Sequence, residues 1–252
     1  MTPAWMKASA VEFRIRYLLH LVIYVLGLFA PWNHWLHLDP AGPNAHSWGI
    51  LAALLAKTGA IGISAAFNLL LVLGIVCASV GVWLRTWGSA YLGAGVVQDG
   101  AMHTSGTGSV IADGPYRHLR NPLYLGTFLH TLALALLMPA SGAAFAIVAI
   151  AIVQVRLILG EESFLAGKLG AAYAAYCALV PRLVPAMRAQ IAGSGAQPRW
   201  GQAFVGEIYM WGVAASFAIA GWWYNGLLLM RCVVISLGVS LVVRALVRRP
   251  VQ

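Results

Sequence analysis

Six apolar runs recur along the chain, and arginine-bearing or polar segments separate them. Each run has about 17 to 22 residues, which matches the length that a helix needs to cross a bilayer. Only 9% of the residues are charged, whereas a soluble domain carries about a quarter. The sequence therefore predicts an all-α, polytopic integral membrane helical bundle with about six transmembrane helices. The runs are residues 17–36, 63–84, 122–138, 143–159, 204–222 and 227–246.

The charge distribution predicts the orientation of this single membrane domain of residues 1–252. The formal net charge is +9, but the arginines flank apolar runs instead of forming a stripe with interleaved aromatics. This arrangement favours a positive-inside collar against anionic lipid and argues against nucleic acid as a partner. Six spans place the Arg-rich segments on one side, so we expect both termini to face the cytoplasm.

Histidine and cysteine positions give no support for a metal site. His34 and His37 are three residues apart and could share a helical face, but a metal site needs more ligands than the sequence pattern places there. The three cysteines show no paired spacing that would indicate a disulfide framework or a zinc site. We therefore expect no metal.

Two further segments constrain the topology and the cofactor. Residues 48–59 are apolar but short, and Lys57 and Thr58 separate them from the next run, so we expect an interfacial or re-entrant helix. The alternative is an additional span. Residues 86–113 form a Gly-rich loop that lacks a GxGxxG motif between a strand and a helix, so a dinucleotide fingerprint is absent.

A basic, aromatic segment leads into the third apolar run at Pro122. Proline suits the first helical position, and Asn121 before it suits the N-cap. Arg120, Tyr116 and Tyr124 would then surround a helix N-terminus whose unpaired N–H groups and positive dipole favour an anion such as a carboxylate. A membrane helix with a basic cytoplasmic collar is the competing interpretation.

A four-residue turn at residues 139–142 predicts that the third and fourth runs form an antiparallel hairpin. Such a hairpin would return Arg156, Glu161 and Glu162 to the side where Arg120 lies. Charged residues inside membrane segments are costly and indicate function by default, and snorkelling to the interface is the alternative for Arg156. We expect Gly160 to interrupt the helix, and residues 161–180 to form an amphipathic interfacial helix. Its apolar face would carry Phe164, Leu165, Leu169, Tyr173 and Tyr176.

Two blocks around this hairpin resemble motifs of the isoprenylcysteine carboxyl methyltransferase family. Residues 110–126, VIADGPYRHLRNPLYLG, are similar to the family's G-x-Y-x-x-x-R-H-P-x-Y-x-G. The second block is similar to R…E-E-x-x-L…F-G-x-x-Y-x-x-Y…V-P…P, and it comprises Arg156, Glu161, Glu162, Leu165, Leu169, Gly170, Tyr173, Tyr176, Pro181 and Pro185. The same superfamily holds phospholipid N-methyltransferases and, more distantly, membrane sterol reductases.

The resemblance covers residues 85–186 and implies a methyltransferase core there, with additional membrane helices in residues 1–84 and 200–252. It implies S-adenosylmethionine as the cofactor, in a pocket at the cytoplasmic face. Asn121 stands where the family usually has His, and an amide cannot titrate near neutrality. The catalytic candidates are Arg120, Arg156 and Glu161, and the cofactor-binding candidates are Gly114, Tyr116, Asn121, Pro122, Tyr124, Glu162, Tyr173 and Tyr176.

We therefore expect an S-adenosylmethionine-dependent enzyme that methylates a lipidic or prenylated small-molecule acceptor among membrane lipids. An isoprenylcysteine-like carboxylate is the first expectation, because a carboxylate is already ionised and needs no base. A phospholipid or small amphipathic amine is the first alternative. A membrane reductase with a nicotinamide cofactor and a non-catalytic scaffold are alternatives from other classes.

Overall fold

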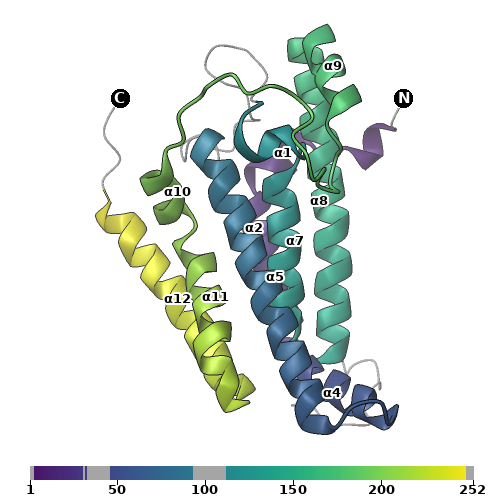
Figure 1. The fold of residues 1–252 in the computed structure, drawn as a ribbon, viewed down its shortest axis with the longest axis vertical. Helices are drawn as coiled ribbons and strands as arrows, with labels where there is room; N and C mark the ends of the chain where they lie inside the picture. The colour runs from purple at the N-terminus through teal and green to yellow at the C-terminus, as the bar shows by residue number, and fades with distance from the viewer. Residues whose placement is uncertain (1–2, 31, 33–45, 93–111, 248–252) are drawn as a thin grey trace. The chain divides into compact units, whose positions relative to one another are not determined.

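The computed structural model describes residues 3–30, 32, 46–92 and 112–247. Within these ranges the chain forms helices and no β-strand (Figure 1). The sequence positions His34 and His37 lie outside the described residues, as does much of the Gly-rich loop. The elements are η1 (Ala4–Met6), α1 (Ala10–Arg14), α2 (Arg16–Phe29), α4 (Ser47–Lys57), α5 (Ile63–Leu92), η2 (Gly114–Arg117), α7 (Pro122–Ala135), α8 (Ala140–Leu169), α9 (Ala171–Leu179), α10 (Trp200–Gly206), α11 (Ile208–Ala220), η3 (Gly221–Trp223) and α12 (Gly226–Leu246).

The helices divide into two compact units, and the chain passes between them several times. The first unit, which we call the polar unit, comprises Met1–Leu19, Trp83–Thr127 and Ala151–Glu207. The second, the apolar unit, comprises His20–Val82, Phe128–Ile150 and Ile208–Gln252. Helices α5, α7 and α8 each contribute residues to both. Most of the Lys and Arg residues belong to the polar unit, which also contains both motif blocks.

Three helices are long and apolar enough to cross a membrane: α5, α8 and α12. The pair α10 and α11 qualifies as a fourth if the two count as one span bent by 69°. Helices α2 and α7 have 14 residues each, which corresponds to about 21 Å at 1.5 Å per residue. All six expected runs therefore contain helix, and the described residues support three or four spans by length and composition. These apolar helices are consistent with an integral membrane protein.

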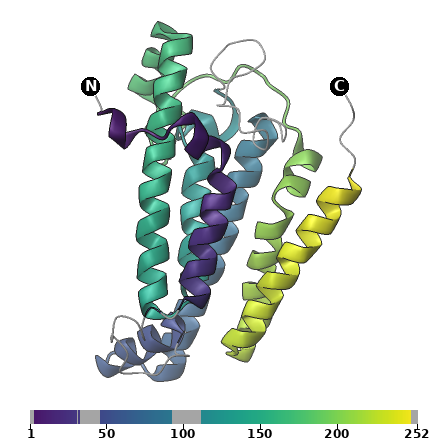
Figure 2. The ribbon, with the colours of Figure 1, turned by 180° about the vertical axis from the view of Figure 1, so that it is seen from behind.

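Within the apolar unit, α11 and α12 form a helical hairpin, and the two helices lie side by side in Figure 1 and in the view from behind (Figure 2). Asn225 caps α12, because its side-chain oxygen accepts from the Leu228 N–H at 2.9 Å. The two helices also approach closely at Gly212, where a Cβ atom would lie 2.6 Å from the Ser236 side chain. A small residue at that crossing is typical of helices that pack in a membrane.

Most of residues 48–59 lies in a separate short helix, α4 (Ser47–Lys57). It has 11 residues, about 16 Å of helix, which is too short to cross a hydrocarbon core of about 30 Å. Its first turn pairs with the α7–α8 connection, since the N–H groups of Ser47 and Trp48 donate to the carbonyls of Met138 and Leu136 at 2.8 and 3.0 Å.

Two expectations for the C-terminal half of the hairpin were wrong. Helix α8 continues through Gly160 to Leu169, and the expected helix at residues 161–180 is divided between the end of α8 and α9. The break falls at Gly170, which has a φ of 54° that suits glycine. Gly160 instead permits close packing, because a Cβ there would lie 2.9 Å from the carbonyl oxygen of Ala8.

Candidate active site

The polar unit contains a pocket at the N-terminus of α7. Its wall comes from the end of α5, from η2, from the first turn of α7, and from α8 and α9. It is lined by Leu92, Tyr116, Arg120, Asn121, Pro122, Leu123, Tyr124, Glu161, Leu165, Leu169, Tyr173 and Tyr176. Eight of the eleven candidates from the sequence are among these residues, and Gly114, Arg156 and Glu162 are not.

The first motif block folds around one glycine. Gly114 has a φ of 56°, and a Cβ at this position would lie 2.3 Å from the Tyr91 ring. Only glycine therefore fits both the backbone conformation and the space. Its contribution to the site is to let η2 pack against α5, which buries Tyr116 in a cluster with Leu92 and Leu123.

Helix α7 begins at Pro122, as the sequence predicts, and the Asn121 carbonyl accepts the first helical bond from Leu125 N–H at 3.2 Å. The Asn121 side chain has a different role from the expected cap. Its Nδ2 atom donates to Glu162 Oε1 at 3.3 Å and to the Arg182 carbonyl at 3.2 Å. The amide at the family's usual His position thus links α7 to the segment after α9.

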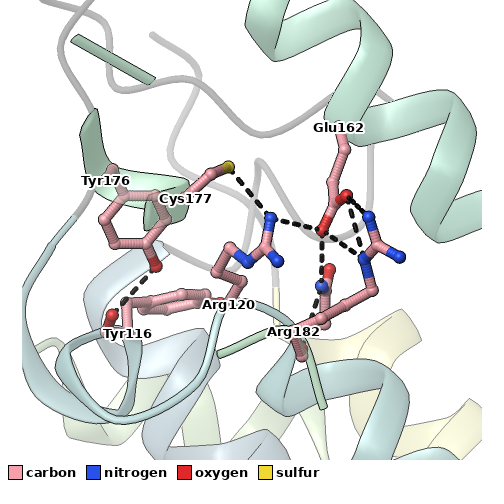
Figure 3. A network of polar contacts seen from close by, with 7 residues as sticks. Tyr116, Arg120, Glu162, Tyr176, Cys177 and Arg182 are labelled. Carbon is pink, nitrogen blue, oxygen red and sulfur yellow. Dashed lines mark hydrogen bonds and ion pairs between the residues drawn. The ribbon is translucent and has the colours of Figure 1, made fainter. Parts of the chain in front are cut away.

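Glu162 is the centre of a charged network beside the pocket (Figure 3). Its carboxylate lies 3.2 Å from Arg120 Nη1 and 2.7 Å from Arg182 Nη2. The same Arg120 nitrogen lies 2.9 Å from the Cys177 sulfur. Hydrogen bonding to Glu162 raises the pKa of Arg182. Two guanidinium groups thus share one carboxylate, and the network carries a net positive charge.

The hairpin brings Glu161 to the pocket as well. Its side chain is 4% exposed, and the Tyr124 hydroxyl on α7 donates to its Oε2 atom at 2.9 Å. A buried carboxylate requires compensation by hydrogen bonds or charge. Glu161 therefore presents a negative group inside the pocket, whereas Glu162 is held in the adjacent network.

Two polar atoms at this site are buried without a hydrogen-bond partner among the described residues, namely the Tyr116 hydroxyl and Arg120 Nε. The Tyr176 hydroxyl donates to the Tyr116 backbone carbonyl at 2.9 Å, not to the Tyr116 hydroxyl. Burial, followed by the Glu161 charge, raises the pKa of Tyr116. The phenol therefore stays protonated and can donate. Buried polar groups are seldom left unpaired, so these two donors indicate a site for a polar ligand.

Arg156 does not join this pocket in the part of the chain that the structure describes. Its guanidinium makes a bidentate pair with Glu12, with Nη2 2.8 Å from Oε1. It also donates to the carbonyls of Trp5 and Lys7. The expectation that the hairpin places Arg156 with Arg120 was therefore wrong, because the N-terminal segment occupies the guanidinium.

Sequence reasoning missed three features of the polar unit. Arg182 and Cys177 belong to the network around Glu162. Arg182 lies within the second motif block but was not among the site candidates. Arg85 makes a buried bidentate pair with Glu207, with both N···O distances 2.8 Å. These residues lie far apart in the sequence, and no local pattern pairs them. No group of His, Cys, Asp and Glu suited to a metal occurs among the described residues.

Chemically, the pocket combines a buried carboxylate, unpartnered donors, aromatic rings and leucine side chains. Such a set can bind a ligand that carries an ammonium group, an anionic group and an apolar part. No curated protein and no solved structure matches the chain significantly. Residues 69–172, however, match the family model described as phospholipid methyltransferase, and this range contains the whole pocket except Tyr173 and Tyr176. Residues 69–172 are thus similar to a family of membrane methyltransferases, and this range overlaps the two motif blocks.

Proposed function

We propose that this pocket binds S-adenosylmethionine and that the protein transfers its methyl group to a lipidic acceptor. The observation that carries the proposal is the meeting of Glu161, Tyr116 and Arg120 in one pocket within the matched region. When bound, the cofactor would supply a methyl group on a sulfonium: the acceptor's lone pair would attack the methyl carbon in line, the methyl C–S bond would break, and neutral S-adenosylhomocysteine would leave.

The residues present fit this cofactor. Glu161 is a buried carboxylate that can hold an ammonium group, and Arg120 has an unpartnered Nε that can donate to a carboxylate. Tyr173 and Tyr176, together with Leu165 and Leu169, supply an aromatic and apolar wall for an adenosine group. The Tyr116 hydroxyl is a further donor for a polar atom of the cofactor or the acceptor.

In this reaction the residues of the chain would hold the cofactor and the acceptor in position. A network that fixes Arg120 through Glu162 and Cys177 limits the rotamers of its guanidinium before any ligand arrives. Holding two reactants in line can supply about 7–11 kcal/mol of the barrier in well-oriented cases. Tyr116, Tyr173 and Tyr176 are buried around the pocket volume, so a ligand that fills it would lose contact with water and its charged contacts would strengthen.

For the acceptor, our first choice remains a lipid carboxylate such as an isoprenylcysteine-like group. A carboxylate nucleophile needs no base, and the unpartnered donors Tyr116 and Arg120 suit an anion. A phospholipid or small amphipathic amine is the second candidate. The family description favours it, and Glu161 is a carboxylate in the pocket that could accept the ammonium proton.

Two measurements test this proposal. Purified protein should bind S-adenosylhomocysteine in isothermal titration or thermal shift, and binding of NADPH in its place would support the reductase alternative. Labelled cofactor should then methylate a prenylcysteine acid in proteoliposomes. Transfer only to an ethanolamine lipid would select the amine candidate, and cofactor binding without transfer to either would reject both acceptors.

We also propose that the polar unit faces the cytoplasm together with both termini, because most Lys and Arg residues belong to it. In intact cells or sealed vesicles of native orientation, a cysteine at Thr58 should react with an impermeant maleimide from outside. A cysteine at Ala192 should react only after permeabilisation. The reverse pattern would reject the orientation.

A further inference from the structure

The segment after α9 presents apolar side chains to solvent from a fixed backbone. Val184 is 78% exposed and Met187 is 96% exposed. Leu179, at the end of α9, is 57% exposed. These three side chains lie within ten residues of each other in the sequence, and their exposure makes the segment a candidate for contact with an apolar phase. We call residues 179–188 the 179–188 loop.

The backbone of this loop is held by the segment that leads into α7. Arg120 N–H donates to the Pro181 carbonyl at 2.9 Å, and Ala186 N–H donates to the His118 carbonyl at 2.9 Å. Asn121 Nδ2 also donates to the Arg182 carbonyl. The loop therefore lies beside the N-terminus of α7, at the point where the chain changes from a polar segment to an apolar helix.

The loop carries basic residues and no acidic ones. No Asp or Glu occurs between Glu162 and Glu207, and the loop itself contains Arg182 and Arg188. Arg182 is paired with Glu162 but its side chain is 48% exposed. Arg188 is exposed beside Met187. Apolar side chains flanked by arginines, next to the end of a membrane helix, complement an anionic lipid surface.

We propose that the 179–188 loop docks into the anionic headgroup region of the bilayer, with Val184 and Met187 inserted at the level of the acyl-chain boundary. The site is independent of the methyl acceptor, and it places Arg120, whose backbone N–H donates to the loop, next to the lipid surface. The position of the loop at the beginning of an apolar helix favours an adjacent bilayer over a soluble partner as the occupant.

The test uses the full chain with Cys77, Cys177 and Cys232 replaced by serine and an NBD fluorophore on Met187→Cys. Val184→Cys is the second labelled position, and Ala192→Cys is the matched control in an exposed part of the same connection. The protein is reconstituted in vesicles of phosphatidylcholine and phosphatidylglycerol at 3:1 and in pure phosphatidylcholine. The readouts are emission wavelength, quenching by iodide, and quenching by lipids brominated near the headgroup end of the chain.

We expect both loop labels to emit at shorter wavelength than the control, to resist iodide and to be quenched by brominated lipid. Arg188→Gln should weaken docking about fivefold in the anionic vesicles, since one basic residue contributes about that factor near such a surface. Arg199→Gln, outside the loop, is the matched charge control. Iodide quenching at Met187 equal to that at Ala192 would overturn the proposal. Protection of the labels from iodide that rises with the protein-to-lipid ratio and does not depend on phosphatidylglycerol would also overturn the proposal. That result would indicate that a second copy of the chain covers the loop.

Discussion

Arg156 and Glu12 form a bidentate ion pair, 144 positions apart in the sequence, with Arg156 Nη2 2.8 Å from Glu12 Oε1. Glu12 also completes a capping box with Ser9 at the start of α1. The pair thus fastens the N-terminal segment to α8, next to the point where Ala8 N–H donates to the Arg156 carbonyl at 2.9 Å. Arg156, a catalytic candidate from the sequence, therefore contacts the N-terminal segment instead of the pocket.

This pairing predicts that Arg156→Lys and Glu12→Gln behave alike. Both side chains are about a third exposed, so each change should cost about 0.2–1 kcal/mol of stability and leave S-adenosylhomocysteine affinity unchanged. Thermal unfolding in detergent and isothermal titration measure the two effects. If Arg156→Lys alone slowed methyl transfer, while Glu12→Gln did not, an acceptor-binding role for Arg156 would be restored.

Glu161→Gln should weaken S-adenosylhomocysteine binding. The substitution removes one charged hydrogen bond, which is worth about 1.5–3 kcal/mol or roughly ten- to a hundred-fold in affinity. Isothermal titration gives the affinity, and Glu12→Gln serves as the matched control because it neutralises a carboxylate outside the pocket. Equal affinity for wild type and Glu161→Gln would remove Glu161 from the cofactor site.

Tyr116→Phe and Tyr176→Phe should have opposite consequences. The Tyr116 hydroxyl is buried without a partner among the described residues, so its removal should leave stability unchanged or raise it slightly, while ligand affinity falls about two- to thirteen-fold. The Tyr176 hydroxyl donates to the Tyr116 carbonyl, so Tyr176→Phe should lower stability by about 1 kcal/mol. Paired thermal-shift and titration curves distinguish the two. Loss of stability in Tyr116→Phe with unaltered affinity would contradict a ligand-binding role.

Local features of the site were predictable, and long-range pairings were not. The start of α7 at Pro122 follows from proline stereochemistry. The predicted hairpin forms and brings Glu161 and Glu162 to the site of Arg120, although its connection lies at residues 136–139 and not at the predicted 139–142. By contrast, the residues next to Gly160 do not indicate whether this glycine interrupts the helix or allows another segment to pack closely. In the structure it allows Ala8 to pack against α8. The apolar neighbours of Arg156 along the helix indicated a functional role for this arginine. Its partner Glu12 belongs to another segment of the chain, which no local pattern indicates.

The Asp113 carboxylate should make the connection at residues 190–196 sensitive to acid. Burial raises the pKa of Asp113, but hydrogen bonds from the Ser194 side chain and backbone lower it by more, so that its pKa in the folded protein lies below the usual 3.8. A lowered folded pKa stabilises the folded form above the unfolded pKa, and this contribution is lost as pH falls through the folded value. The connection at residues 190–196 of the wild type should therefore open below about pH 4, and limited proteolysis in acid should cleave it there. In Asp113→Asn the same connection should be cleaved at neutral pH as well. Identical digestion of the two proteins at neutral pH would contradict the stabilising role of the Asp113 carboxylate.

The pair Arg85 and Glu207 should be the most sensitive charge contact in the polar unit. Their side chains are 14% and 5% exposed, and Arg85 also donates to Thr127 Oγ1 at 2.8 Å. Removing one member of a buried pair leaves an uncompensated charge and typically costs about 3–5 kcal/mol, whereas replacing both with apolar residues of similar volume is often neutral. Glu207→Gln should therefore lower the unfolding temperature strongly, and Arg85→Met with Glu207→Leu should recover most of that loss. Thermal unfolding of Arg85→Met, of Glu207→Leu and of the double variant measures this coupling. Additive losses would mean that the two side chains stabilise the fold independently.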